Sequence, residues 1–98
     1  MIRRIVKMVF RPEETETFQD IFEQSAPFIR QQQGCLHLEL WRDENDARIF
    51  FTYSHWESPQ DLEAYRNSEL FATTWTKTKQ LFADKPQAWS LHQLAVHP

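Results

Sequence analysis

The order of apolar and polar positions divides the chain into strand-like and helix-like segments. Four segments place apolar side chains at alternate positions, which is the period of a β-strand: residues 2–10, 35–43, 48–56 and 87–95. Two others repeat apolar side chains three and four positions apart, which is the period of an amphipathic helix: residues 12–33 and 59–82. The pattern therefore predicts the order strand, helix, strand, strand, helix, strand.

Proline, serine and glycine mark the expected helix boundaries. Pro12, followed by three glutamates, begins the first helix, because proline fits a first turn and carboxylates suit the positive end of the helix dipole. Ser58 and Ser68 are each placed as an N-terminal cap, so the second helical segment is broken in two. Pro27 predicts a kink or an interruption in the first helix, and Gly34 is expected to cap its C-terminus.

Alternation in the two middle strands predicts which side chains share a face of the sheet. These strands are joined by a polar turn and form a hairpin. One face of the first strand carries its leucines, Leu36, Leu38 and Leu40. Its other face is then expected to carry Cys35, His37, Glu39 and Trp41. One face of the second strand carries Phe50, Thr52, Ser54 and Trp56.

The element order is that of the ferredoxin-like split βαβ fold. In this α+β arrangement, a four-stranded antiparallel sheet carries both helices on one face. We expect a single domain over residues 1–98, without internal repeat or linker. The other face of the sheet would still carry Leu, Phe, Tyr and Trp side chains. We therefore expect a second copy of the chain to cover it in a homodimer.

Composition and charge narrow the possible functions. A hydrophobic content of 41% with a single glycine is typical of an ordered globular protein. The formal net charge of -3, with scattered Lys and Arg, offers no basic surface for nucleic acid. Lys7 interrupts the apolar N-terminal segment, so we expect neither a membrane span nor a signal peptide. The lone Cys35 allows no intrachain disulfide and favours a reducing, cytoplasmic location.

Two stretches of the sequence resemble a known family. The sequence QQQGCLHLEL at residues 31–40, and HWESPQDLEAYRNSELF at residues 55–71, resemble the antibiotic-biosynthesis monooxygenase superfamily of dimeric α+β barrels. The resemblance covers essentially the whole chain. It implies a homodimer whose two sheets close a barrel, with one pocket per subunit between sheet and helices. It also implies three candidate chemistries: oxygen insertion into a hydroxylated polycyclic or quinol-like aromatic without metal or flavin, haem degradation, or isomerisation of a small signalling sugar.

Two departures from the family pattern narrow these chemistries. Tyr65 stands where many relatives carry a histidine on the short helix, so a histidine proton acceptor is lost or replaced there. The haem-degrading members need an asparagine on the first strand and a histidine on the last helix. Neither residue type occurs at the matching segments, residues 1–10 and 72–82. Haem degradation is therefore disfavoured.

The aromatic corner around residues 55–71 is the candidate site. Trp56 offers an aromatic face and one N–H donor, and it fits either a pocket wall or a core plug between sheet and helix. Thr52 and Ser54 share its strand face, where hydroxyls could orient substrate oxygens, although Thr is also an ordinary strand residue. The remaining wall of the pocket is expected to consist of aromatic residues, Phe22, Phe71 and Trp75, although such a helical stripe more often forms ordinary core.

Two residues are candidates for proton chemistry. The hydroxyl of Tyr65 could bind a phenolate oxygen. His37 could accept a proton, since an unperturbed histidine has a pKa of about 6.5. The favoured alternative is a dimer-interface residue hydrogen-bonded to Glu39. His37, Glu39 and His55 together could bind a metal ion, but such strand pairs are common and we assign no metal.

Together with these residues, the resemblance implies a cofactor-independent monooxygenase whose partners are a small aromatic substrate and molecular oxygen. Oxygen reacts slowly with closed-shell molecules, so the electron must come from the substrate as an enolate or phenolate. The protein must then hold the ring, take or stabilise a proton, and exclude water. The expected catalytic residues are Trp56, Tyr65 and His37. Two alternatives remain open: a dimeric barrel that binds a small aromatic without turnover, and an oxygen-independent isomerase that uses the same pocket.

Overall fold

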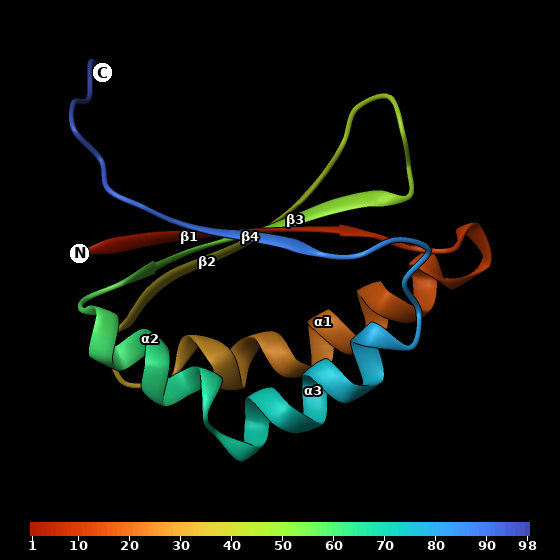
Figure 1. Ribbon diagram of the computed structural model, residues 1–98, viewed down its shortest axis with the longest axis horizontal. Helices are drawn as coiled ribbons and strands as arrows, with labels where there is room; N and C mark the ends of the chain where they lie inside the picture. Colours follow the sequence, from red (N-terminus) through yellow and green to blue (C-terminus); the bar gives the residue numbers. More distant parts are fainter.

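The protein folds into a four-stranded antiparallel sheet with three helices on one face. A computed structural model describes residues 1–98 (Figure 1). Its elements in chain order are β1 (Ile2–Val9), the short 3-10 helix η1 (Pro12–Glu14), α1 (Thr15–Arg30), β2 (Cys35–Arg42), β3 (Ile49–Trp56), α2 (Pro59–Arg66), α3 (Glu69–Lys79) and β4 (Gln87–Leu91). The strands lie in the order β2-β3-β1-β4. The ferredoxin-like fold is thus confirmed.

Serine caps set the starts of α2 and α3 as predicted. The hydroxyl of Ser58 accepts a hydrogen bond of 3.1 Å from the backbone N–H of Asp61. The hydroxyl of Ser68 accepts one of 3.1 Å from the backbone N–H of Phe71. Each cap satisfies an N–H that has no partner inside the helix, so the chain can stop one helix and start another within two residues.

The first helix differs from the prediction at its end. α1 continues through Pro27 without interruption. Pro27 lies in the last turn, so only the carbonyl one turn before it loses a partner. The C-terminal cap is Gln31, and the prediction that Gly34 caps the helix is wrong. Gly34 instead adopts a φ of 82° in the turn into β2, where a side chain would collide with Asp61.

A β-bulge at the start of β2 changes the face of one predicted residue. Cys35 pairs with Trp56 and His37 pairs with His55, so Leu36 is an extra residue in the ladder. Cys35 is consequently buried on the helix-covered face, and its predicted grouping with His37 is wrong. Simple alternation cannot detect this residue, because a bulge shifts the period of two by one position.

Two apolar clusters form the core at opposite ends of the helix-covered face. One contains Met8, Phe10, Phe18 and Phe50, and the rings of Phe10 and Phe18 stack at 4.2 Å. The other contains Ile2, Cys35 and Leu62, together with the indole of Trp56. α1 packs against β2 and α3, and α2 packs against β3. This packing leaves space between α3 and the inner face of the sheet.

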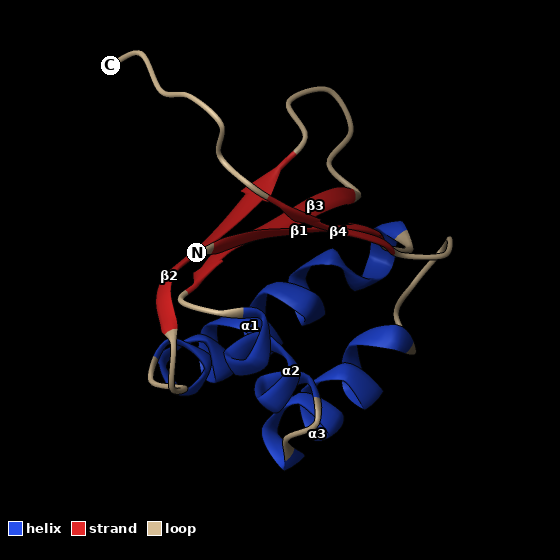
Figure 2. Cartoon of the chain, turned by 60° about the vertical axis from the view of Figure 1, so that its left-hand side comes forward, coloured by secondary structure: helices blue, strands red, loops and turns tan.

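The opposite face of the sheet is free of helices (Figure 2). The loop between β2 and β3 and the residues after β4 extend to this side in both views (Figures 1 and 2). Large apolar side chains on it remain about two-fifths exposed: Trp41 at 40%, Trp89 at 43% and Leu91 at 42%. None of the helices combines the length and apolar character needed to cross a membrane.

Candidate functional site

A cavity of about 320 Å³ lies between the sheet and the helices. Its floor comes from all four strands, with Leu38 as the contribution of β2, and its walls come from all three α-helices. All the aromatic and hydroxyl residues proposed from the sequence line it, namely Phe22, Thr52, Ser54, Trp56, Tyr65, Phe71 and Trp75. The structure therefore brings these seven residues together around one space.

A continuous series of aromatic contacts forms one wall of the cavity. The rings of Trp56 and Tyr65 stack with centroids 5.1 Å apart and an interplanar angle of 20°. Tyr65 meets Phe71 edge to face at 5.3 Å, and Phe71 stacks on Trp75 at 5.8 Å. The Ser68 cap turns the chain between α2 and α3, and thereby places Tyr65 beside Phe71. Such a wall suits a flat apolar ligand.

Trp56 borders the cavity but is almost completely buried, and its N–H already has a partner. The indole Nε1–H donates a 2.9 Å hydrogen bond to the hydroxyl of Ser54, and both residues are buried. Indole has a single donor, so none remains for a substrate oxygen. Trp56 belongs to the core cluster and also lines the cavity. The two roles considered for it from the sequence are therefore compatible.

Tyr65 is protonated at neutral pH and can act only as a hydrogen-bond donor or acceptor. Burial, with a smaller contribution from the nearby Cys35 thiol, raises the pKa of its hydroxyl to about 12. No hydrogen bond within the chain opposes this rise. No buried polar side-chain atom lacks a partner, so the unbonded Tyr65 hydroxyl keeps some contact with solvent, and Tyr65 lines the cavity. Its proton is therefore available to an oxygen atom of a ligand.

Two arginines that the sequence analysis did not select are the only charged residues lining the cavity, Arg4 and Arg66. Arg4 donates a 3.0 Å hydrogen bond to Ser90, and Arg66 forms a 3.6 Å ion pair with Glu63. Burial and the charge of Arg66 lower the pKa of Arg4, and Glu63 partly offsets this. Arg4 could have been recognised from the sequence as a site residue, because it occupies an inward position of β1, where the other inward residues are apolar.

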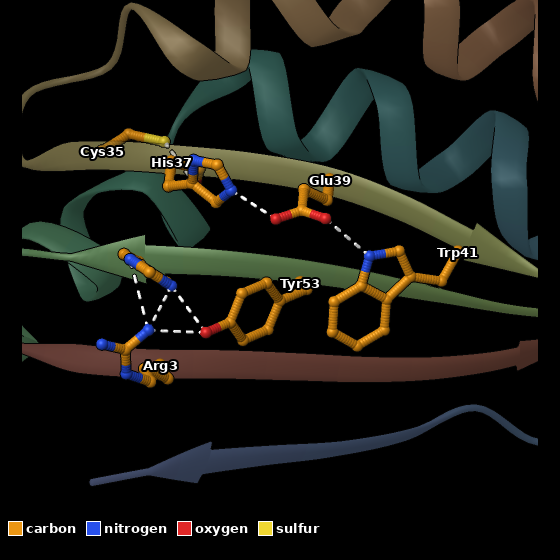
Figure 3. Close-up of polar contacts among 7 residues, drawn as sticks. Arg3, Cys35, His37, Glu39, Trp41 and Tyr53 are labelled. Carbon is orange, nitrogen blue, oxygen red and sulfur yellow. Dashed lines mark hydrogen bonds and ion pairs between the residues drawn. The ribbon is translucent and has the colours of Figure 1, made fainter. Parts of the chain in front are cut away.

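His37 is not brought to the cavity. It lies on the uncovered face of the sheet, where its Nε2 contacts a carboxylate oxygen of Glu39 (Figure 3). The other oxygen of Glu39 accepts a 2.8 Å hydrogen bond from the indole of Trp41. Hydrogen bonds from Trp41 and then His37 lower the pKa of Glu39. The sheet thus separates His37 from the aromatic residues with which it was predicted to act.

A second polar group adjoins His37 on the same face (Figure 3). The guanidinium of Arg3 donates a 2.6 Å hydrogen bond to the Tyr53 hydroxyl and contacts the ring of His55. Burial, Arg3 and His37 lower the pKa of His55, so its ring is neutral at pH 7. No group of three or more His, Cys, Asp or Glu side chains in the structure is arranged to hold a metal ion.

Comparisons with known proteins agree with the fold. Residues 1–77 match a family model described as antibiotic biosynthesis monooxygenase. A solved structure of an antibiotic biosynthesis monooxygenase is 17% identical, with a TM-score of 0.90, over 97% of this chain and 100% of that one. A conserved protein from Methanosarcina mazei Go1 is 14% identical, with a TM-score of 0.90, over 94% of this chain and 91% of that one. PA3566 from Pseudomonas aeruginosa is 22% identical, with a TM-score of 0.85, over 96% and 94% of the two chains. Such identities establish the fold alone, and no curated protein matches the sequence.

Proposed function

The chain belongs to the antibiotic biosynthesis monooxygenase family, and on this premise we propose that it oxygenates a small hydroxylated aromatic or quinol-like molecule without metal or flavin. The observation that carries the proposal is the cavity wall formed by the stacked rings of Trp56 and Tyr65. A flat substrate ring has a matching surface there. The cavity floor adds the hydroxyl of Thr52, which can orient a substrate oxygen.

Tyr65 supports the reaction as a hydrogen-bond donor. With a pKa of about 12, its hydroxyl keeps its proton at neutral pH. A phenolate or enolate oxygen is a stronger acceptor than the neutral hydroxyl or ketone, so the hydrogen bond favours the ionised substrate. Tyr65 thus stabilises the electron-rich form that reacts with oxygen, and it does not remove the proton itself.

The chemistry follows from that ionised substrate. The bound anion gives one electron to O₂, and the resulting carbon radical and superoxide combine into a C–O bond. The resulting peroxide anion takes a proton from solvent to become a hydroperoxide, and loss of water, formed from its outer O–H and the hydrogen on that carbon, leaves a carbonyl there. The substrate loses two hydrogens and gains one oxygen atom, and the second oxygen atom leaves as water. Exclusion of bulk water by the aromatic wall protects the intermediates.

The cavity lining contains no Asp, Glu or His side chain that could take a proton at neutral pH. A monooxygenase of this kind therefore requires a substrate that binds as an anion. The same observation favours a second candidate, a protein that binds the aromatic without turnover. An oxygen-independent isomerase is less supported, because it needs a base to move a proton between carbon atoms.

Oxygen consumption tests the proposed activity. Chelator-treated protein is incubated with a panel of quinols and polyhydroxylated aromatics, beside the variants Trp56→Ala and Tyr65→Phe. The matched control is Tyr53→Phe, which removes the same hydroxyl from the other face of the sheet. We expect uptake above the autoxidation blank that falls at least about tenfold in both cavity variants and not in the control. Binding of these compounds without uptake would identify a binding protein instead.

The proposed assembly is a homodimer joined through the uncovered face of the sheet. The exposed Trp41, Trp89 and Leu91 on this face support it, because large apolar side chains gathered on one surface favour association. Size-exclusion chromatography with light scattering should give twice the chain mass of 11.9 kDa. A single-chain mass at micromolar concentration would refute the homodimer.

A further inference from the structure

The two arginines of the cavity lie beside the aromatic stack from opposite sides. Arg4 of β1 pairs in register with Ser54 of β3, the residue that fixes the indole of Trp56. Arg66 is the last residue of α2 and directly follows Tyr65. One guanidinium therefore approaches from the sheet and the other from the helix. Both belong to the end of the cavity that holds the proposed site.

The positive charge at this end is only partly balanced, by Glu63 outside the cavity. The protein has a formal net charge of -3, yet both charged lining residues are cations and no acidic side chain lines the space. The partner of Arg66, Glu63, is an exposed residue outside the lining, at a contact distance of 3.6 Å. Like charges that face a partly dewatered space raise the free energy of the empty site, and an anion between them lowers it.

Both guanidinium groups also have N–H donors that form no hydrogen bond within the chain and are available to a ligand. Each carries five N–H donors in a planar fork. Of these, Arg4 uses one for the hydroxyl of Ser90, and Arg66 makes only its long ion pair with Glu63. A planar carboxylate matches such a fork through two parallel hydrogen bonds.

We propose that the substrate is an aromatic carboxylate and that Arg4 and Arg66 bind its carboxylate at the end of the cavity where Trp56 and Tyr65 stack. This inference rests on the proposed function, because it names the substrate class of the same site. The cavity volume of about 320 Å³ is at the lower end of known ligand pockets, which span about 300–1,000 Å³, so a compound of one or two rings fits.

The carboxylate contact has a consequence for the reaction. It anchors the ring so that its body extends along the wall toward Phe71 and Trp75. The two positive charges then lie near a hydroxyl on the adjacent ring carbon and favour its ionised form. The cavity can thereby hold the substrate as a phenolate although it contains no proton-accepting side chain.

Isothermal titration calorimetry with two matched probes tests this assignment. The probes are 1-hydroxy-2-naphthoate and 1-naphthol, which share the ring and hydroxyl and differ in the carboxylate. We expect the wild-type protein to bind the naphthoate roughly 10 to 100 times more tightly, the range expected for hydrogen bonds to a charged group. Arg4→Gln and Arg66→Gln should each remove most of this preference, because they should weaken naphthoate binding far more than 1-naphthol binding.

Controls separate the specific contact from general charge and from misfolding. Lys77→Gln removes one positive charge from an exposed position of α3 that does not line the cavity, and it should keep the preference. Arg66 is exposed at the end of its helix, so Arg66→Gln tests the proposal even if Arg4→Gln fails to fold. Circular dichroism verifies the fold of each variant.

Three outcomes overturn the inference. They are equal affinity for the two probes, a preference that survives in both arginine variants, and no naphthoate binding at millimolar concentration. If 1-naphthyl phosphate binds more tightly than the naphthoate and this binding depends on the two arginines, the substrate class is a phosphate ester and the carboxylate assignment is wrong. These titrations involve no turnover, so the carboxylate preference can hold while oxygen uptake is absent. Conversely, oxygen uptake with neutral quinols, together with no preference for the naphthoate over 1-naphthol, would support the proposed monooxygenase and refute the proposed carboxylate substrate.

Discussion

The hydrogen bond between Trp56 and Ser54 allows a quantitative test of how the site is held. Ser54→Ala removes the hydroxyl that accepts from the indole N–H at 2.9 Å. The side chains have fractional exposures of 1% for Trp56 and 7% for Ser54, so the N–H would remain buried without a partner. Leaving such a donor unpaired costs about 1–3 kcal/mol. We expect the free energy of unfolding to fall by that amount.

A double-mutant cycle isolates the hydrogen bond from the packing of the ring. Trp56→Phe removes the N–H together with part of the aromatic surface, so it should destabilise the protein more than Ser54→Ala does. In the Trp56→Phe background, Ser54→Ala has no donor to leave unpaired and should cost less than about 0.5 kcal/mol. The difference between the two backgrounds is the coupling energy, expected at about 1 kcal/mol or more.

Urea unfolding followed by circular dichroism measures these free energies. Protein concentration must be the same for all variants, because the stability of the proposed homodimer would depend on it. In a thermal experiment, each kcal/mol should lower the Tm by about 4–8 °C for a domain of this size. If Ser54→Ala lies within about 0.5 kcal/mol of the wild type in both backgrounds, the indole N–H finds another acceptor and the reasoning is refuted.

Three further outcomes are expected. Gly34→Ala should lower the free energy of unfolding by about 2 kcal/mol or more, because alanine is strained at a φ of 82° and its Cβ collides with Asp61; a thermal melt with a loss below about 1 kcal/mol would contradict this. Cys35 is 4% exposed and burial raises the pKa of its thiol, so Ellman's reagent should react with the native protein on the order of 100 times more slowly than with the urea-unfolded chain, and similar rates would contradict its burial. The folded state keeps the Tyr65 proton up to about pH 12, whereas the unfolded chain releases it near its ordinary pKa of about 10. The stabilising contribution is therefore complete below about pH 10 and lost between about pH 10 and 12. Across this window, the free energy of unfolding of the wild type in urea should fall by about 3 kcal/mol relative to that of Tyr65→Phe. Parallel pH profiles for the two proteins would disprove the pKa shift.

Much of the fold follows from local signals in the sequence. The period of the apolar residues predicts six segments in the correct order, and the serines at 58 and 68 begin α2 and α3 as caps. These features depend on residues within one turn or one strand, so the spacing of those residues in the sequence is sufficient to predict them. The boundaries were less accurate, since β4 ends at Leu91, four residues before the predicted end at residue 95.

The candidate site was partly predictable for the same reason. Alternation in β3 placed Thr52, Ser54 and Trp56 on one face, and the structure puts that face toward the cavity. The partner of the indole N–H was not predictable, because it depends on the rotamers of two side chains that share a strand. The roles of these residues in oxygen chemistry stay predictions.

The sequence by itself determined the strand and helix order, the helix caps and the aromatic corner, because each arises from interactions between residues close in the chain. Only the tertiary structure decided three other points. The bulge at Leu36 moved Cys35 to the buried face, and the sheet separated His37 from the cavity. Packing of α2 over the sheet brought Arg66 to the same cavity as Arg4, 62 positions earlier in the chain. Such long-range juxtapositions depend on strand register and helix packing, which no local pattern of residues specifies.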